Sequence, residues 1–82
     1  MIEDLNQLLD KTLNLNGRGL EFIESTKLLG ELPELDSLAV RELLSAIEQH
    51  YKIHIEDDEI DGSVFETVGS LYKYIQHKVG QK

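Results

Sequence analysis

The 82-residue chain contains no cysteine, no tryptophan and a single proline. Without cysteine it can form no disulfide, no thiolate metal site and no cysteine nucleophile, so any thiol chemistry requires a thiol from outside the sequence. No apolar run approaches the roughly 20 residues that span a bilayer. The first five residues are acidic and lack the basic flank of a signal peptide. We therefore expect a soluble cytoplasmic protein that does not enter membranes.

Basic residues are also scarce. The chain has 16 Asp and Glu against 8 Lys and Arg, a net charge of −8. Eleven of the carboxylates lie between Glu31 and Glu66, where Arg41 and Lys52 are the only basic residues. Such a field repels nucleic acid and anionic lipid and attracts basic protein surfaces. The sequence predicts protein partners with basic docking surfaces, and neither nucleic acid nor a membrane.

The length allows one small domain with a modest core, too small to enclose a large active site of its own. No internal repeat, alternating β-pattern or second domain is visible. We expect a monomeric single domain over residues 1–82, with residues 79–82 as a frayed tail.

Apolar residues recur at helical spacing in three segments. The first covers residues 2–15 and is followed by Gly17, which lets the chain leave a helix. The second covers residues 37–51. Its apolar positions follow the i, i+3, i+4, i+7 pattern of one helix face: Val40, Leu43, Leu44, Ile47 and Tyr51.

The third segment is an amphipathic helix at the end of the chain. It starts either near Ser63, which forms a capping-box pattern with Glu66, or at Thr67 as a direct cap. The segment from 16 to 35 reads as a long packed loop with a short helical turn near residues 20–25. Residues 57–61 predict one further short turn. The pattern as a whole predicts an all-α bundle of three longer helices and one short helix, with a long first loop.

Asp36-Ser37-Leu38 stands at the start of the second helix. A serine hydroxyl there lies in the positive field of the helix N-terminus, where free backbone N–H groups stabilise a phosphate ester. Serine is also a common helix cap. The motif alone fits either a cap or a point of phosphate attachment.

Several motifs in the same order and spacing resemble those of acyl carrier proteins over nearly the whole chain, as far as Ile75. They are Asp36-Ser37-Leu38, Glu42-Leu43, Glu48, Tyr51, Ile55, the acidic run 57–61 and Thr67-Val68. In that family the serine bears 4′-phosphopantetheine, which a phosphopantetheinyl transferase transfers from coenzyme A. The resemblance implies a non-catalytic carrier that holds acyl groups as thioesters on an arm attached to Ser37.

The resemblance also implies that the second helix docks against acyl-loading and acyl-transfer enzymes. Asp36 and Leu38 would flank the attachment site. The residues expected to recognise partners are Arg41, Glu42, Glu48, Asp57, Asp58 and Asp61.

Two departures from the family pattern concern the subtype. Fatty-acid carriers commonly have glycine three residues before the serine and an acidic residue two after it, whereas this chain has Glu34 and Ala39. The stretch is more similar to free-standing bacterial carriers of polyketide-like or exopolysaccharide-associated systems. Fatty-acid biosynthesis, a peptidyl or aminoacyl cargo, and an unmodified acidic interaction module remain alternatives.

Two other kinds of site are disfavoured. Residues 57–62 resemble the start of a calcium-binding EF-hand loop, but position 12, which needs a bidentate glutamate, is Val68. His50, His54 and His77 show no spacing typical of a metal centre or a catalytic triad, and we expect solvated surface side chains. The sequence therefore predicts neither a metal site nor a catalytic residue.

Overall fold

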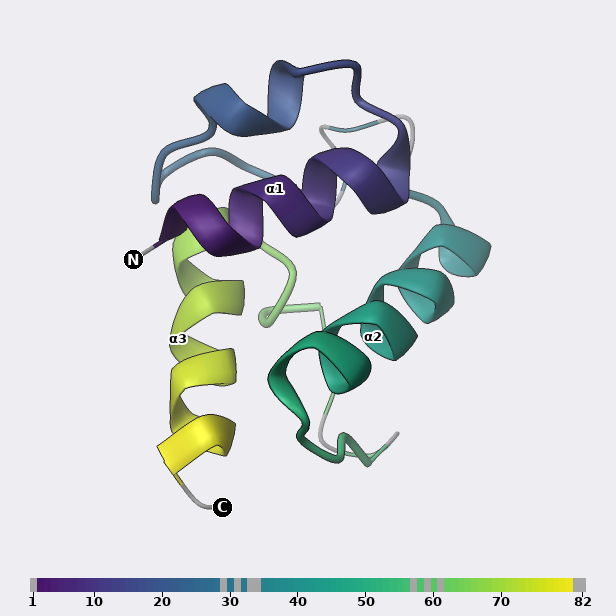
Figure 1. Ribbon diagram of the computed structural model, residues 1–82, viewed down its shortest axis with the longest axis vertical. Helices are drawn as coiled ribbons and strands as arrows, with labels where there is room; N and C mark the ends of the chain where they lie inside the picture. Colours follow the sequence, from purple (N-terminus) through teal and green to yellow (C-terminus); the bar gives the residue numbers. More distant parts are fainter. Residues whose placement is uncertain are drawn as a thin grey trace.

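The computed structural model describes residues 2–28, 30, 32, 35–56, 58, 60 and 62–80 (Figure 1). It contains the α-helices α1 (Ile2–Leu13), α2 (Ser37–Tyr51) and α3 (Val68–Gly80), and a short 3-10 helix, η1 (Arg18–Glu21). Within the described residues there is no strand beyond an isolated bridge between Lys27 and Thr67. The predicted all-α bundle is confirmed.

Helix α1 is the central element. It contacts η1 on one side and both α2 and α3 on the other, and it lies across the ends of those two helices (Figure 1). The start of α1 lies near the start of α3, and its end lies near the start of α2. None of the helices in the described part of the chain is long and apolar enough to cross a membrane.

The core is built from all three long helices and from the segments between them. The helices contribute Leu5, Leu9, Leu13, Leu43, Ile47, Val68, Leu71 and Ile75, and the connecting segments contribute Leu15, Leu28, Leu35, Ile55 and Phe65. Each buried side chain of this kind stabilises the fold by about 1.5–3 kcal/mol. The first loop is therefore packed through Leu28 and Leu35, whereas its apolar residues Leu20 and Ile23 are exposed.

Helix α1 ends two residues earlier than predicted. Asn14 adopts a left-handed conformation with φ of 55°, which ends the helix. The Asp10 carboxylate then accepts hydrogen bonds from the N–H groups of Gly17 at 2.8 Å and Gly19 at 3.0 Å. These bonds turn the chain back across α1. Leu15, which was predicted to be helical, is instead a fully buried loop residue.

The predicted turn in the first loop is present but begins earlier, as η1. A Cβ atom on Gly19 would lie 2.8 Å from the Asp10 Cβ, so only glycine allows η1 to approach α1 this closely. The second predicted turn, over residues 57–61, falls largely outside the described residues.

Helix α3 begins at Val68, next to the second of the two expected caps. The Thr67 hydroxyl accepts the Ser70 N–H and the Ser70 hydroxyl accepts the Thr67 N–H, both at 3.0 Å. The helix continues through Val79 and Gly80, the first two residues of the predicted tail. Lys78 in the last turn favours this continuation, because a cation stabilises the negative end of a helix.

Candidate functional site

Ser37 is the first residue of α2, but the helix cap is Asp36. The Asp36 side chain accepts the Ala39 N–H at 2.8 Å and its backbone is extended, as a capping residue requires. The Ser37 side chain is exposed, and its hydroxyl has no hydrogen-bond partner among the described residues. The interpretation of Ser37 as a plain cap is therefore wrong, because its neighbour performs that function.

The first turn of α2 also leaves backbone donors free. The first hydrogen bond within the helix runs from the Val40 N–H to the Asp36 carbonyl, and Asp36 also accepts the Ala39 N–H. The N–H groups of Ser37 and Leu38 have no acceptor in the described part of the chain. A helix N-terminus carries roughly half a positive charge. The two free N–H groups beside the Ser37 hydroxyl can therefore stabilise an anion.

The predicted flanking residues surround this hydroxyl. Leu38 is 65 % exposed, a large apolar side chain in open solvent. Arg41 and Glu42 are exposed one turn further along α2. A cavity of about 200 Å³ lies between the end of α1 and the start of α2, and Asp36, Leu38 and Glu42 are among its walls. Asp36, Leu38 and Glu42 therefore line one cavity next to Ser37 in the sequence, whereas Arg41 is not among its walls.

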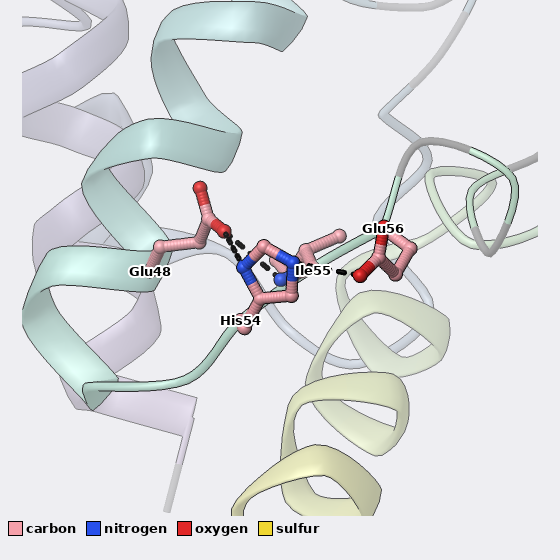
Figure 2. Close-up of polar contacts among 4 residues, drawn as sticks. All are labelled: Glu48, His54, Ile55 and Glu56. Carbon is pink, nitrogen blue, oxygen red and sulfur yellow. Dashed lines mark hydrogen bonds and ion pairs between the residues drawn. The ribbon is translucent and has the colours of Figure 1, made fainter.

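The Glu48 carboxylate, expected to meet a partner protein, instead makes contacts within the chain (Figure 2). It accepts the Ile55 N–H at 2.9 Å, and the same carboxylate oxygen lies 3.5 Å from His54 Nδ1. His54 Nε2 in turn lies 2.8 Å from a Glu56 carboxylate oxygen. Glu48 thus holds the segment after α2 against the end of that helix, a role that sequence reasoning missed.

The histidines are exposed, as predicted, and two of them, His50 and His54, contact carboxylates of other segments. His50 Nε2 lies 2.8 Å from Asp4 Oδ2 and links α2 to α1, while His54 lies between Glu48 and Glu56. His50 is also thirteen residues beyond Ser37, about 20 Å along a helix. Neither histidine is near enough to act as a base for the Ser37 hydroxyl.

Tyr51 closes the far end of α2. Burial of its ring, together with the nearby Asp4 carboxylate, raises the pKa of Tyr51 from 10.0 to about 12. Its ring meets His50 edge to face, with the centroids 4.8 Å apart. The phenol is therefore neutral at physiological pH and belongs to the α1–α2 contact.

The structure describes part of the acidic segment after Ile55. Asp58 is exposed, whereas Asp57, Glu59 and Asp61 lie outside the described residues. In the part that is described, no group of three or more His, Asp or Glu side chains is placed to hold a metal ion.

Comparison with known proteins identifies the family. Residues 21–75 match the family model described as the phosphopantetheine attachment site. The chain is 33 % identical over 76 residues to the acyl carrier protein of Wolinella succinogenes, covering 93 % of each chain. The chain belongs to the acyl carrier protein family. Its fold also matches the solution structure of a holo acyl carrier protein from Nitrosomonas europaea, with a TM-score of 0.89, 39 % identity and coverage of 96 % and 95 %.

Membership defines the cofactor and the kind of activity. Acyl carrier proteins are non-catalytic, and their cofactor is covalently attached 4′-phosphopantetheine. That group supplies, when bound, the thiol that this cysteine-free carrier lacks. A carrier works by interacting with a transferase and with biosynthetic enzymes. The start of α2 fits the group, because it combines an exposed hydroxyl with free donors for a phosphodiester.

Proposed function

We propose that Ser37 is the residue that bears the 4′-phosphopantetheine arm, on which this carrier holds acyl groups as thioesters. The observation that carries the proposal is the free hydroxyl of Ser37 at a helix start whose cap is Asp36. An attachment residue must be reachable by another enzyme's active site, and Ser37 is exposed. Its two neighbouring N–H groups can then bind the phosphodiester once it has formed.

Ser37 is also the best placed of the five serines. Ser70 is engaged in hydrogen bonds at the start of α3. Ser45 is exposed but lies in the middle of α2, where backbone N–H groups bond within the helix. Ser25 and Ser63 lie outside the α-helices. Only Ser37 combines exposure with a helix N-terminus.

The modification itself requires a partner enzyme. The Ser37 hydroxyl would act as the nucleophile toward the pyrophosphate of coenzyme A, while a transferase-bound Mg²⁺ neutralises the developing charge. The Oγ–P bond forms as the pyrophosphate P–O bond breaks, and 3′,5′-ADP leaves. The hydroxyl proton passes to a base of the transferase.

The docking face centres on the first two turns of α2. Asp36 and Glu42 present negative charge to basic partner surfaces, and exposed Leu38 offers an apolar contact between them. Arg41 on the same turns would require a matching carboxylate on the partner. Asp58 extends the acidic surface, and Asp57 and Asp61 are proposed with it although they lie outside the described residues. The Glu48 carboxylate is engaged internally and is omitted from this face.

The pathway inferred is a specialised one. Glu34 and Ala39 depart from the pattern of the primary fatty-acid carriers, and Ala39 borders the 200 Å³ cavity beside Ser37 without adding a charge to it. This favours delivery to polyketide-like or exopolysaccharide-associated enzymes over those of primary fatty-acid synthesis. We infer that residues 1–82 act as a single monomeric domain in the cytoplasm.

The test is incubation with a broad-specificity phosphopantetheinyl transferase, coenzyme A and Mg²⁺, followed by intact-mass measurement. The wild-type chain should gain the mass of one arm, and so should the matched control Ser45→Ala. Ser37→Ala should gain nothing. A gain by Ser37→Ala would move the site elsewhere. No gain by the wild type, while a known carrier in the same tube is modified, would reject the carrier function for that enzyme.

A further inference from the structure

Three cavities lie along the contact between α1 and α2. The first, of about 200 Å³, begins at the residues on either side of Ser37 and is lined by Thr12. Thr12 also lines the second, of about 410 Å³, which shares Lys11 and His50 with a third of about 170 Å³. The three cavities follow one another along this contact and share lining residues, and we call the row the seam groove.

The seam groove is lined by hydrogen-bonding side chains that have no partner in the part of the chain that the structure describes. Gln7, Lys11, Thr12 and Gln49 line it, and none of them has a hydrogen bond or an ion pair among the described residues. Leu8 and Ala46 provide an apolar surface between them. A ligand that alternates amide and hydroxyl groups with short methylene segments would match this lining.

The length of the seam groove matches that of the arm. It runs along α1 from Leu13 back to Asp4, a separation of nine residues that corresponds to a rise of about 14 Å in a helix. At its far end, the Asp4–His50 contact of 2.8 Å joins the two helices. About fourteen bonds separate the serine oxygen from the sulfur of pantetheine, on the order of 16 Å when extended, from the peptide spacing of ~3.5 Å per three bonds.

We propose that the pantetheine arm, when it carries no acyl group, rests in the seam groove with its thiol near Lys11 and His50. This inference depends on attachment at Ser37, the proposed function. The arm's amides pair with the free side chains of Thr12, Lys11 and Gln49, and its methylenes cover Leu8 and Ala46. Partner enzymes that dock on the first turns of α2 would then draw the arm out of the groove.

The absence of cysteine makes the arm directly traceable. In the holo protein its thiol is the only thiol, so a maleimide nitroxide labels that position alone. Paramagnetic relaxation enhancement of the backbone amides, measured on ¹⁵N-labelled protein, should then be strongest at Gln7, Lys11 and His50. Enhancement strongest at Ile55 and Val64, or weak and uniform, would overturn the proposal.

A second readout avoids the bulk of the label. The backbone amide chemical shifts of ¹⁵N-labelled holo and apo protein, both without the nitroxide, should differ at Thr12, Lys11 and Gln49 as well as at the start of α2. Differences confined to the residues next to Ser37 would contradict a resting site in the seam groove. Intact mass of the same sample shows whether the arm is attached, so failure of the proposed function is distinguished from failure of this inference.

A variant that fills the seam groove can be compared with a variant that adds the same side chain outside it. Ala46→Phe places a ring in the second cavity, whereas Ser45→Phe adds the same ring at the next residue, which lines none of the three cavities. The first variant should reduce the enhancement at Gln7 and Lys11 several-fold, and the second should preserve it. If Ala46→Phe does not fold, Gln49→Trp at an exposed wall of the same cavity replaces it. Unchanged enhancement in a folded groove-filling variant would refute the assignment.

Discussion

Helices α2 and α3 both carry a serine in the first turn, but their N-termini are built in opposite ways. At α3 the Val68 N–H donates to the Thr26 carbonyl at 2.9 Å and the Gly69 N–H to the Glu24 carbonyl at 2.8 Å. The Ser70 N–H donates to the Thr67 hydroxyl. The start of α3 is therefore closed by protein groups.

The start of α2 is open by comparison. Asp36 satisfies the Ala39 N–H, while Ser37 and Leu38 have no acceptor within the described residues. The Ser70 hydroxyl accepts the Thr67 N–H and lies 2.9 Å from the carbonyls of Val64 and Thr67, one of which takes its proton. The Ser37 hydroxyl has no such contacts with the described residues. A helix N-terminus thus becomes a candidate site only where its donors and a nucleophile both remain free.

The largest effect on stability is expected from opening the start of α3. A Cβ atom at residue 69 would lie 2.9 Å from the Glu24 carbonyl oxygen, so Gly69→Ala must displace the loop that closes the helix. The loss of well-placed hydrogen bonds should lower the free energy of unfolding by about 2 kcal/mol, or roughly 10 °C in Tm. Thermal unfolding followed by circular dichroism measures the change.

The control for this variant lies in the same helix. Gly80→Ala adds a methyl group in open space at the end of α3, and its Tm should change little. Equal Tm values for Gly69→Ala and wild type would show that the loop carbonyls do not support the start of α3.

Substitution of Ser70 should affect stability alone, and substitution of Ser37 should affect modification alone. Ser70→Ala removes hydrogen bonds that close α3 and should destabilise the fold by about 1–2 kcal/mol, because a partly buried donor loses its partner. It should still accept the arm. Ser37→Ala should leave stability within about 0.5 kcal/mol, as typical for an exposed side chain, and abolish modification. Denaturant unfolding measures the stability of both variants, and intact mass measures their modification. A stable Ser70→Ala that accepts no arm, or a destabilised Ser37→Ala that accepts it, would contradict these assignments.

The Asp36 cap should contribute a smaller amount. Asp36→Ala removes the 2.8 Å bond to the Ala39 N–H and should cost about 1 kcal/mol in the apo protein. Asp36→Asn retains the acceptor and should recover most of that loss. Urea unfolding compares them. If Asp36→Asn were as unstable as Asp36→Ala, the negative charge rather than the hydrogen bond would be the stabilising factor.

The raised pKa of Tyr51, at the far end of α2, should not change stability with pH near neutrality. The pKa of Tyr51 is raised to about 12, so the folded state favours the neutral phenol. The stability that this shift contributes is fully present below about pH 10 and is lost as pH rises from about 10 toward 12. Tyr51→Phe should flatten this decline, measured as Tm between pH 9 and 11, and leave modification unchanged. A slower modification rate would show that the start of α2 is not independent of its end.

Local patterns predicted some elements well. The bounds of α2 follow from its apolar periodicity and from Asp36, both of which act within a few residues. The end of α1 was misjudged because Asp10 reaches forward to Gly17 and Gly19, and the left-handed turn at Asn14 has no periodic signal.

Contacts between distant segments were harder to foresee. The choice of Thr67 over Ser63 as the start of α3 depends on carbonyls of Glu24 and Thr26, some forty residues earlier. Glu48 was predicted to be a surface charge that recognises partners. Its contact with the Ile55 N–H leaves no sign in the sequence, because Ile55 comes from the segment that turns back after α2. Ser37 was proposed from the sequence, but that its hydroxyl has no partner among the described residues is seen only in the structure.

The most direct test of the account is to locate the arm among the five serines. Wild-type protein modified by a phosphopantetheinyl transferase would be digested, and tandem mass spectrometry would assign the added mass to a residue. The account predicts that the arm is found on Ser37 alone. Attachment to Ser25, Ser45, Ser63 or Ser70 would contradict it, because those serines lack an open helix N-terminus.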